Sequence, residues 1–238
     1  MSRLVARLGR ASYLADRAFE RATGGRARLH AMWFYSQPVP AARPAGDAAG
    51  PAARRGGAAA QASSPVVVRR VGAGEVDEAK FQRPSGVVAA RFQAGSECVA
   101  ALRDGELLGY AWLEFAAVDE LLVRAVFEPA PRGRVAWDYD VWIAPKYRLG
   151  RVFSRLWEEA HALLRLRGVE ATVSWIAMRN EASIRSHERM GARRVGWAAF
   201  LLLGPLQLTL ASVRPFVHVA LPGRPPVRLR VRGCGASR

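Results

Sequence analysis

The sequence predicts an α+β domain with a mixed, mostly antiparallel sheet flanked by helices. Three observations carry this prediction. Asp104-Gly105 separates two apolar runs, which is a strong signal for an antiparallel hairpin. A strand, an amphipathic helix and a second strand follow one another over residues 135–176, as in a parallel crossover. Hydrophobic residues make up 50% of the 238-residue chain, which is enough for a sizeable core.

The first 40 residues are expected to form a helix and a strand. Residues 3–21 place apolar side chains near helical spacing, with arginines elsewhere around the helix. Such a basic amphipathic helix can lie on an anionic membrane or pack on its own domain, and both interpretations stay open. The apolar run Leu29–Val39 predicts a strand that is stopped by Pro38 and Pro40.

Residues 41–65 consist almost wholly of Ala, Gly, Pro, Arg and Ser. This composition buries little apolar surface and predicts a disordered segment. It is either a linker or an insertion between two strands of one domain. We expect the main domain to occupy residues 66–213.

Short apolar runs and turn signals alternate through the first half of that domain. The expected elements are a strand at Val66–Val71, a helical turn at Glu75–Phe81, a helical or extended run at Val87–Phe92, the hairpin strands Glu97–Arg103 and Leu107–Phe115, and a strand at Leu121–Phe127.

The second half has longer elements. They are a strand at Val135–Ile143, an amphipathic helix at Gly150–Leu166, a buried strand at Ala171–Ile176, a helix at Asn180–Met190, and strands at Val195–Leu203 and Leu206–Val213. Residues 214–238 are rich in Pro and Arg without an obvious period. We therefore expect a basic tail there.

The net charge of +16 is concentrated in the flanks. Residues 1–64 hold ten arginines against three acids, and residues 214–238 hold six arginines and no acid. The expected domain between them is nearly neutral, which disfavours nucleic acid as its main ligand. Peripheral membrane contact through the basic N-terminus stays open.

Cys98 and Cys234 are the only cysteines, and they lie far apart without metal-type spacing. This pattern is typical of a reduced protein with neither a disulfide framework nor a cysteine metal site. The N-terminus lacks a continuous apolar stretch behind its basic residues, so no signal peptide is expected. These features together predict a cytoplasmic protein without a metal.

An anion site is predicted where the strand Val135–Ile143 gives way to the helix. Its sequence is Pro145-Lys146-Tyr147-Arg148-Leu149-Gly150-Arg151-Val152. The free backbone N–H groups at a helix N-terminus attract phosphate, and the two arginines add suitable charge.

This stretch, followed by Asn180-Glu181-Ala182-Ser183 and His187-Glu188-Arg189-Met190-Gly191, resembles the GCN5-related N-acetyltransferase (GNAT) superfamily. The resemblance covers roughly residues 90–213. It implies a GNAT-like fold that binds acetyl-CoA or another acyl-CoA and passes the acyl group to an amine by direct attack. Two glycines of the usual family loop would fall at 151 and 153, where this chain has Arg151 and Phe153; Gly150 lies one position early.

The resemblance also implies which residues meet the cofactor. The turn would hold the pyrophosphate, and the strand end would offer backbone groups to the pantetheine arm. The later helix would flank that arm. The implied cofactor-binding residues are Trp142, Ile143, Ala144, Tyr147, Arg148, Leu149, Gly150, Arg151, Val152, Asn180 and Ser183.

Three residues are candidates for proton transfer. His187 stands where many family members have the tyrosine that protonates the leaving thiolate, and histidine titrates near neutral pH. Asp138 and Asp140 share one face of their strand by the period of two, and either could accept a proton from the amine. Structural pairing with arginine remains an alternative for both. Glu114 and Ser174 are weaker candidates for the acceptor side.

The resulting hypothesis is an acyl-CoA-dependent N-acyltransferase acting on a small-molecule amine of unknown identity. Three alternatives stay open: a GNAT-like scaffold without catalysis, a binder of nucleic acid or membrane through the arginine-rich flanks, and an enzyme for a longer acyl donor. The sequence does not indicate an oligomeric state.

Overall fold

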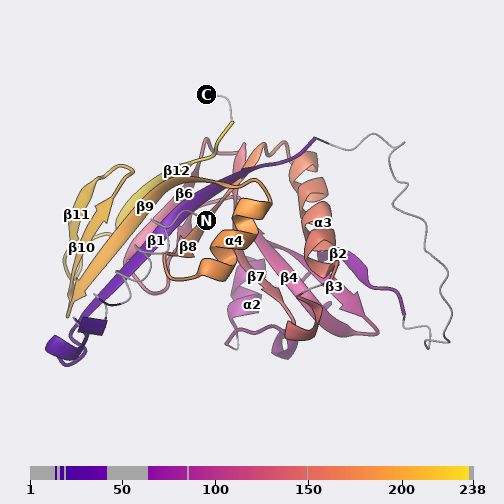
Figure 1. Ribbon diagram of the computed structural model, residues 1–238, viewed down its shortest axis with the longest axis horizontal. Helices are drawn as coiled ribbons and strands as arrows, with labels where there is room; N and C mark the ends of the chain where they lie inside the picture. The colour runs from indigo at the N-terminus through magenta and orange to yellow at the C-terminus, as the bar shows by residue number, and fades with distance from the viewer. Residues whose placement is uncertain are drawn as a thin grey trace. The chain divides into compact units, whose positions relative to one another are not determined.

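The computed structural model describes residues 14, 17–18, 20–41, 64–84, 86–148 and 150–235 (Figure 1). The chain divides into two compact units, each built from separate stretches of sequence. The first unit comprises residues 1–39, 114–139 and 168–238, and the second comprises residues 40–113 and 140–167. Strand β7 (Val135–Ile143) runs from the first unit into the second at Tyr139–Asp140.

The first unit contains a large sheet with β1 at its centre. Its strands lie in the order β11-β10-β9-β1-β8, followed by the N-terminal half of β7. Their bounds are β1 (Ala27–Pro38), β8 (Ala171–Ala177), β9 (Arg193–Leu203), β10 (Leu206–Ala211) and β11 (Val217–Ala220). These neighbours are antiparallel except β7 and β8, which are parallel because a helical crossover connects them.

A smaller sheet in the same unit has the order β12-β6-β5, with β12 (Val227–Arg232), β6 (Ala125–Ala130) and β5 (Val118–Asp119). Buried side chains from both sheets form one core. Phe127 of β6 lies edge-on to Phe34 of β1 and Trp175 of β8, with ring centroids 5.6 and 5.2 Å apart. Burying large aromatic side chains in this way dominates the stability of such a core.

Helix α4 (Glu181–Arg189) covers the other face of β1. Because successive strand side chains point to opposite faces, Met32 and Phe34 enter the core between the sheets, whereas Trp33 and Tyr35 pack with Ile184 of α4. This packing fixes the helix on which His187 lies.

The second unit contains strands β2 (Val67–Val71), β3 (Glu97–Arg103), β4 (Glu106–Glu114) and the C-terminal part of β7, in the order β2-β3-β4-β7. Its helices are η1 (Glu78–Lys80), α2 (Val87–Gln93), η2 (Pro145–Tyr147) and α3 (Val152–Leu166). β4 is buried on both faces: Trp112 meets Phe81 and Phe92, while Gly109 lies under Leu156 of α3.

Gly109 is required by the close approach of β4 to β7 and α3. A Cβ atom there would lie 2.8 Å from the carbonyl oxygen of Trp142, 2.7 Å from Ile143 Cδ1 and 3.2 Å from Leu156 Cδ1. Gly109→Ala is therefore expected to lower the free energy of unfolding by about 1–3 kcal/mol, because a backbone atom cannot yield as a side-chain tip can. Urea denaturation measures this loss. Gly133→Ala is the comparison variant. An added Cβ atom at Gly133 would contact no other atom, but its φ of +82° disfavours a side chain, so this variant measures backbone strain without crowding.

The predicted fold class is confirmed, as are the hairpin, the crossover and the two long helices, with boundaries shifted by one or two residues. The run Val87–Phe92, left open between helix and strand, is helical. Of the expected N-terminal helix, Leu14, Arg17, Ala18 and residues 20–22 are helical, and its remaining positions lie outside the described residues. Most of the expected linker, residues 42–63, also lies outside them.

Two expectations about strands were wrong. Leu121 and Leu122, expected in a strand, are 85% and 66% exposed in a bend, and the strand begins at Ala125, where β12 provides a partner. Residues 214–235, expected as part of a basic tail without periodicity, contain β11 and β12, and alternate side chains of β12 enter the core of the first unit. In the described part of the chain, no helix is long and apolar enough to span a bilayer.

Candidate functional site

The first unit brings Asp138 and His187 together. Asp138 lies on β7 and His187 on α4, and their exposed fractions are 2% and 7%. His187 Nε2 is 3.6 Å from Asp138 Oδ1, which is the distance of an ion pair rather than of a hydrogen bond. Neither carboxylate oxygen of Asp138 has a hydrogen-bond partner within the described residues. A buried carboxylate in this state is costly unless a cation compensates it, and the imidazolium form of His187 can do so.

The second ring nitrogen of His187 fixes its tautomer. Nδ1 lies 2.8 Å from the carbonyl oxygen of Ser183, one helical turn earlier, and can only donate to it. In the imidazolium form Nε2 also carries a proton, and that N–H would face Asp138. Burial is the largest single influence and lowers the pKa of His187, but Asp138 and the Ser183 carbonyl together outweigh it, so the pKa is raised above 6.5.

The raised pKa of His187 predicts a pH-dependent contribution to stability. The imidazolium is favoured in the folded state, so its contribution is complete below the unfolded pKa of about 6.5 and is lost as pH rises through the folded value. The difference in unfolding free energy between the parent protein and His187→Gln should therefore be larger at pH 5.5 than at pH 9. Urea denaturation at both pH values measures it, and an equal difference at both would contradict the assignment.

Asp140 has different partners from Asp138. In the second unit its carboxylate pairs with Arg83 and with Arg91, and the Asp140 side chain is only 5% exposed. Its φ of +53° interrupts the regular alternation of β7, a conformation that Asp tolerates better than most residues. A carboxylate held by two guanidinium groups is a poor proton acceptor. Asp140 thus shows the structural pairing with arginine that is the alternative to a role in proton transfer.

Asn180 and Ser183 form the N-cap of α4. Asn180 Oδ1 accepts a hydrogen bond of 3.2 Å from the backbone N–H of Ser183, which satisfies one of the free amides of the first turn. The Asn180 side chain and the Ser183 backbone therefore position the start of the helix that carries His187. This arrangement links both residues to the Asp138–His187 pair in the first unit.

The predicted pyrophosphate turn lies in the second unit, before α3. No side chain caps this helix at its N-cap residue Arg151, and its first turn has no acidic residue. Arg148 and Arg151 are exposed. Open amides, a helix dipole and two cations favour an anion at this position, and the anion site itself stays a prediction. Gly150 is exposed, Val152 is buried, and Leu149 lies outside the described residues.

Arg151 and Phe153 stand at the two positions where the family usually has glycine. Arg151 is exposed, and Phe153 packs edge-on against Trp157 one turn later, with centroids 6.4 Å apart. Tyr147 is held beside the β3–β4 hairpin: its hydroxyl lies 3.4 Å from Glu106, and Arg103 stacks over its ring. The turn is therefore anchored on both sides.

The strand end that precedes the turn is partly engaged within its own unit. The Ile143 carbonyl accepts a hydrogen bond of 3.1 Å from Arg148 Nε, and the Ala144 N–H donates to Leu108 O at 2.9 Å. Trp142 stacks on Tyr110 with centroids 5.6 Å apart. The ladder between β7 and β8 extends only from Val135 to Trp137, although both strands continue.

Ser174 and Glu114 are the weaker candidates for the acceptor side of the site. Ser174 is buried on β8, and Glu114 accepts hydrogen bonds of 2.8 Å from the N–H groups of Phe115 and Ala116. Glu114 therefore stabilises the turn after β4. Among the residues that the structure describes, no cluster of three or more His, Cys, Asp or Glu side chains could hold a metal ion.

The model of the "Acetyltransferase (GNAT) family" matches residues 72–192, half of the chain. The chain belongs to the GNAT family of acetyltransferases. The match includes β7, the turn, α3, β8 and all of α4. Comparison with curated proteins gave no significant match.

Solved structures similar to this GNAT chain have low identity and TM-scores below 0.5. One is a GNAT-family protein of Novosphingobium aromaticivorans, with 17% identity, a TM-score of 0.44, and coverage of 73% of this chain and 64% of that one. An acetyltransferase of Trypanosoma brucei has 16% identity, a TM-score of 0.40 and coverage of 54% and 93%. AAC(6')-Iy in complex with a CoA bisubstrate analogue has 14% identity, a TM-score of 0.43 and coverage of 54% and 90%. The chain thus spans less than two thirds of the first of these proteins.

Some contacts of the GNAT chain could not be found from the sequence. Arg83 and Arg91 carry no motif that marks them as partners of Asp140. Asp138 and His187 meet only through the packing of α4 on the sheet. The contact between His187 and Ser183 has a signal, because residues four apart lie on one helix face.

Proposed function

We propose that this protein is an acyl-CoA-dependent N-acyltransferase that moves an acetyl group from acetyl-CoA to a small-molecule amine. Membership of the GNAT family supports an acyltransferase. The amine nitrogen attacks the thioester carbonyl carbon, the C–S bond breaks, and an amide and a thiol form. One proton must leave the ammonium form of the acceptor, and one must reach the departing thiolate.

The observation that carries the proposal is the buried Asp138–His187 pair. Buried ionisable pairs of this kind are enriched at functional sites, although structural ion pairs occur as well. In its imidazolium form His187 would hold a proton on Nε2 that it can deliver to a thiolate, and Asp138 would accept the proton of the acceptor amine, directly or through water. Asp140 keeps a structural role in this proposal because Arg83 and Arg91 occupy its carboxylate.

The cofactor would be held by the predicted turn. The uncapped amides at the start of α3, with Arg148 and Arg151, suit the pyrophosphate of CoA. The backbone groups of Trp142, Ile143 and Ala144 at the end of β7 would meet the amide groups of the pantetheine arm, as the family resemblance implies.

A thiol-release assay with acetyl-CoA and a panel of amino sugars, amino acids and polyamines tests this function. Mass spectrometry should find an acceptor whose mass increases by one acetyl group in step with thiol release. A protein that binds CoA but releases no thiol with any acceptor would instead be a scaffold. The side chains of Arg151 and Phe153 in place of glycines are the observation that favours this second candidate.

A further inference from the structure

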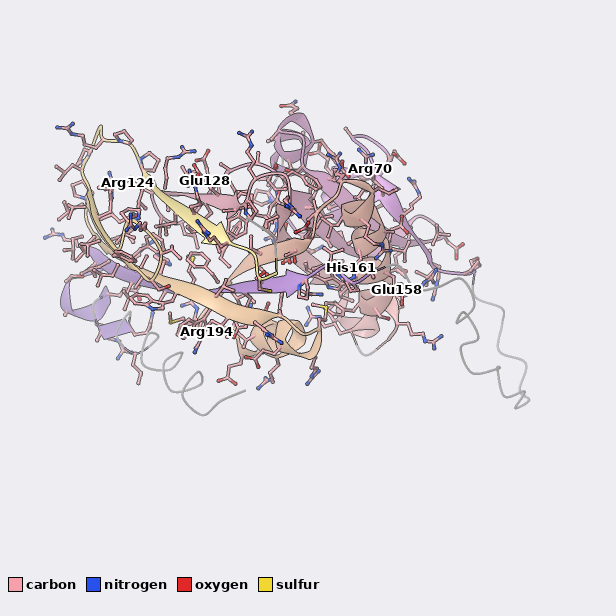
Figure 2. All side chains as sticks on the ribbon, turned by 90° about the horizontal axis from the view of Figure 1, so that it is seen from above. Arg70, Arg124, Glu128, Glu158, His161 and Arg194 are labelled. Atoms are coloured by element: carbon pink, nitrogen blue, oxygen red, sulfur yellow. The ribbon has the colours of Figure 1, made fainter. Side chains whose placement is uncertain are left out.

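β12 presents a row of arginines on its exposed face. Its sequence Val-Arg-Leu-Arg-Val-Arg buries the aliphatic side chains and exposes Arg228, Arg230 and Arg232. Alternate residues of a strand lie roughly 6.6–7 Å apart, so the three guanidinium groups form a regular ladder. Glu128 of β6 lies beside this strand, which is yellow in Figure 2, and pairs with Arg228 and Arg230.

The backbone groups of these three arginines face the free edge of the small sheet. β12 is an edge strand whose neighbour is β6. The N–H of Val227 donates to Arg124 O, and the N–H of Gly233 donates to Ala130 O, so the odd-numbered residues direct their backbone groups toward β6. The backbone groups of Arg228, Arg230 and Arg232 therefore point to the open edge.

A groove of about 1160 Å³ runs along this edge. Its lining includes the arginine ladder and a group of apolar side chains, Val195, Val213 and Phe216, which form its apolar wall. Phe216 is 56% exposed. The groove thus combines a basic wall, an apolar wall and unpaired strand groups.

The charge along the groove is unbalanced. Arg214 at the rim adds to the ladder, and Glu128 is the acidic residue in the lining. In the part of the chain that the structure describes, no ion pair is found for Arg214 or Arg232. The residues outside the described ranges are themselves basic in sequence, with two acids, Asp16 and Asp47, against seven arginines.

We propose that this groove binds an extended acidic segment of another protein, which adds to β12 as a strand. The backbone of the segment would pair with the open edge, and carboxylates at alternate positions would match the spacing of the arginine ladder. Its intervening side chains would contact the apolar wall. A nucleic acid has matching charge but no backbone amide with which to complete the edge, and a flat membrane surface does not fill a groove.

Fluorescence anisotropy on the full chain tests this inference with a labelled short peptide of alternating glutamate and threonine. We expect saturable binding that the Arg230→Gln/Arg232→Gln variant weakens about tenfold, as expected for losing two exposed ion pairs. Arg224→Gln removes one charge from the turn before β12, outside the groove lining, and should change binding less than about twofold. Circular dichroism confirms that each variant is folded.

Three outcomes would overturn the proposal. The first is the absence of peptide binding. The second is equal binding of a peptide whose amides are N-methylated, because edge pairing needs those donors. The third is tighter binding of an oligothymidylate of matched charge, or of phosphatidylserine vesicles, that is lost in the same double variant. Hydrogen exchange gives a direct readout: the peptide should slow exchange at the amides of Arg228, Arg230 and Arg232.

Discussion

Asp138→Asn is expected to lower kcat for acyl transfer by about 10²–10³-fold, within the range for removing a general base or acid. The substitution keeps the volume of the side chain but removes its charge and proton affinity. It also removes a main influence that raises the pKa of His187, so burial should then dominate and lower that pKa below its ordinary value. Steady-state kinetics and an NMR titration of the His187 ring measure the two effects.

Asp119→Asn is the matched control, since this residue is exposed on β5. It should leave kcat and the His187 titration unchanged. A kcat for Asp138→Asn within about threefold of the parent value would show that the Asp138–His187 pair is structural. A lowered kcat with an unchanged His187 pKa would show instead that the contact between the two side chains does not persist in solution.

Arg148→Gln/Arg151→Gln is expected to raise KM for acetyl-CoA by about 100-fold with little change in kcat. Each lost charge-assisted hydrogen bond to phosphate is worth about 1.5 kcal/mol or more. S-acetylpantetheine lacks the pyrophosphate, so its kcat/KM should be the same in parent and variant. Comparing the two acyl donors separates phosphate binding from damage to the fold.

Arg165→Gln is the control for this pair of substitutions. It removes one positive charge near the C-terminal end of α3, roughly 20 Å along the helix from its start. Its KM for acetyl-CoA should stay within about twofold of the parent value. An equal rise in KM for both acyl donors in Arg148→Gln/Arg151→Gln would contradict a phosphate role for the turn.

The elements that could be predicted from the sequence are those with a strong local signal. The Asp104-Gly105 hairpin depends on a two-residue turn, and α3 depends on an apolar stripe of helical period. β12 also has a local signal, the alternation of arginine with Val227, Leu229 and Val231. The exposed arginines of β12 resemble those in the rest of the basic flank. Its partner β6 lies about a hundred positions earlier in the sequence, so the alternation alone does not indicate which sheet β12 joins.

The candidate site was predictable only in part, for a related physical reason. The turn before α3 follows from a helix start and its charges, which are local properties. The meeting of Asp138 with His187 depends on α4 packing over β1, and the separation of Asp138 from Asp140 depends on a positive φ that breaks the period of two. Neither the contact between Asp138 and His187 nor the positive φ of Asp140 has a signal within a few residues of sequence.

Calorimetric titration of the purified full chain with CoA is the most direct test of the acyl-CoA assignment. We predict saturable binding of one CoA per chain, and a large loss of that affinity in Arg148→Gln/Arg151→Gln. The absence of binding heat and of any competing displacement, with a protein shown to be folded by circular dichroism, would contradict the proposal that this GNAT-family chain uses acyl-CoA.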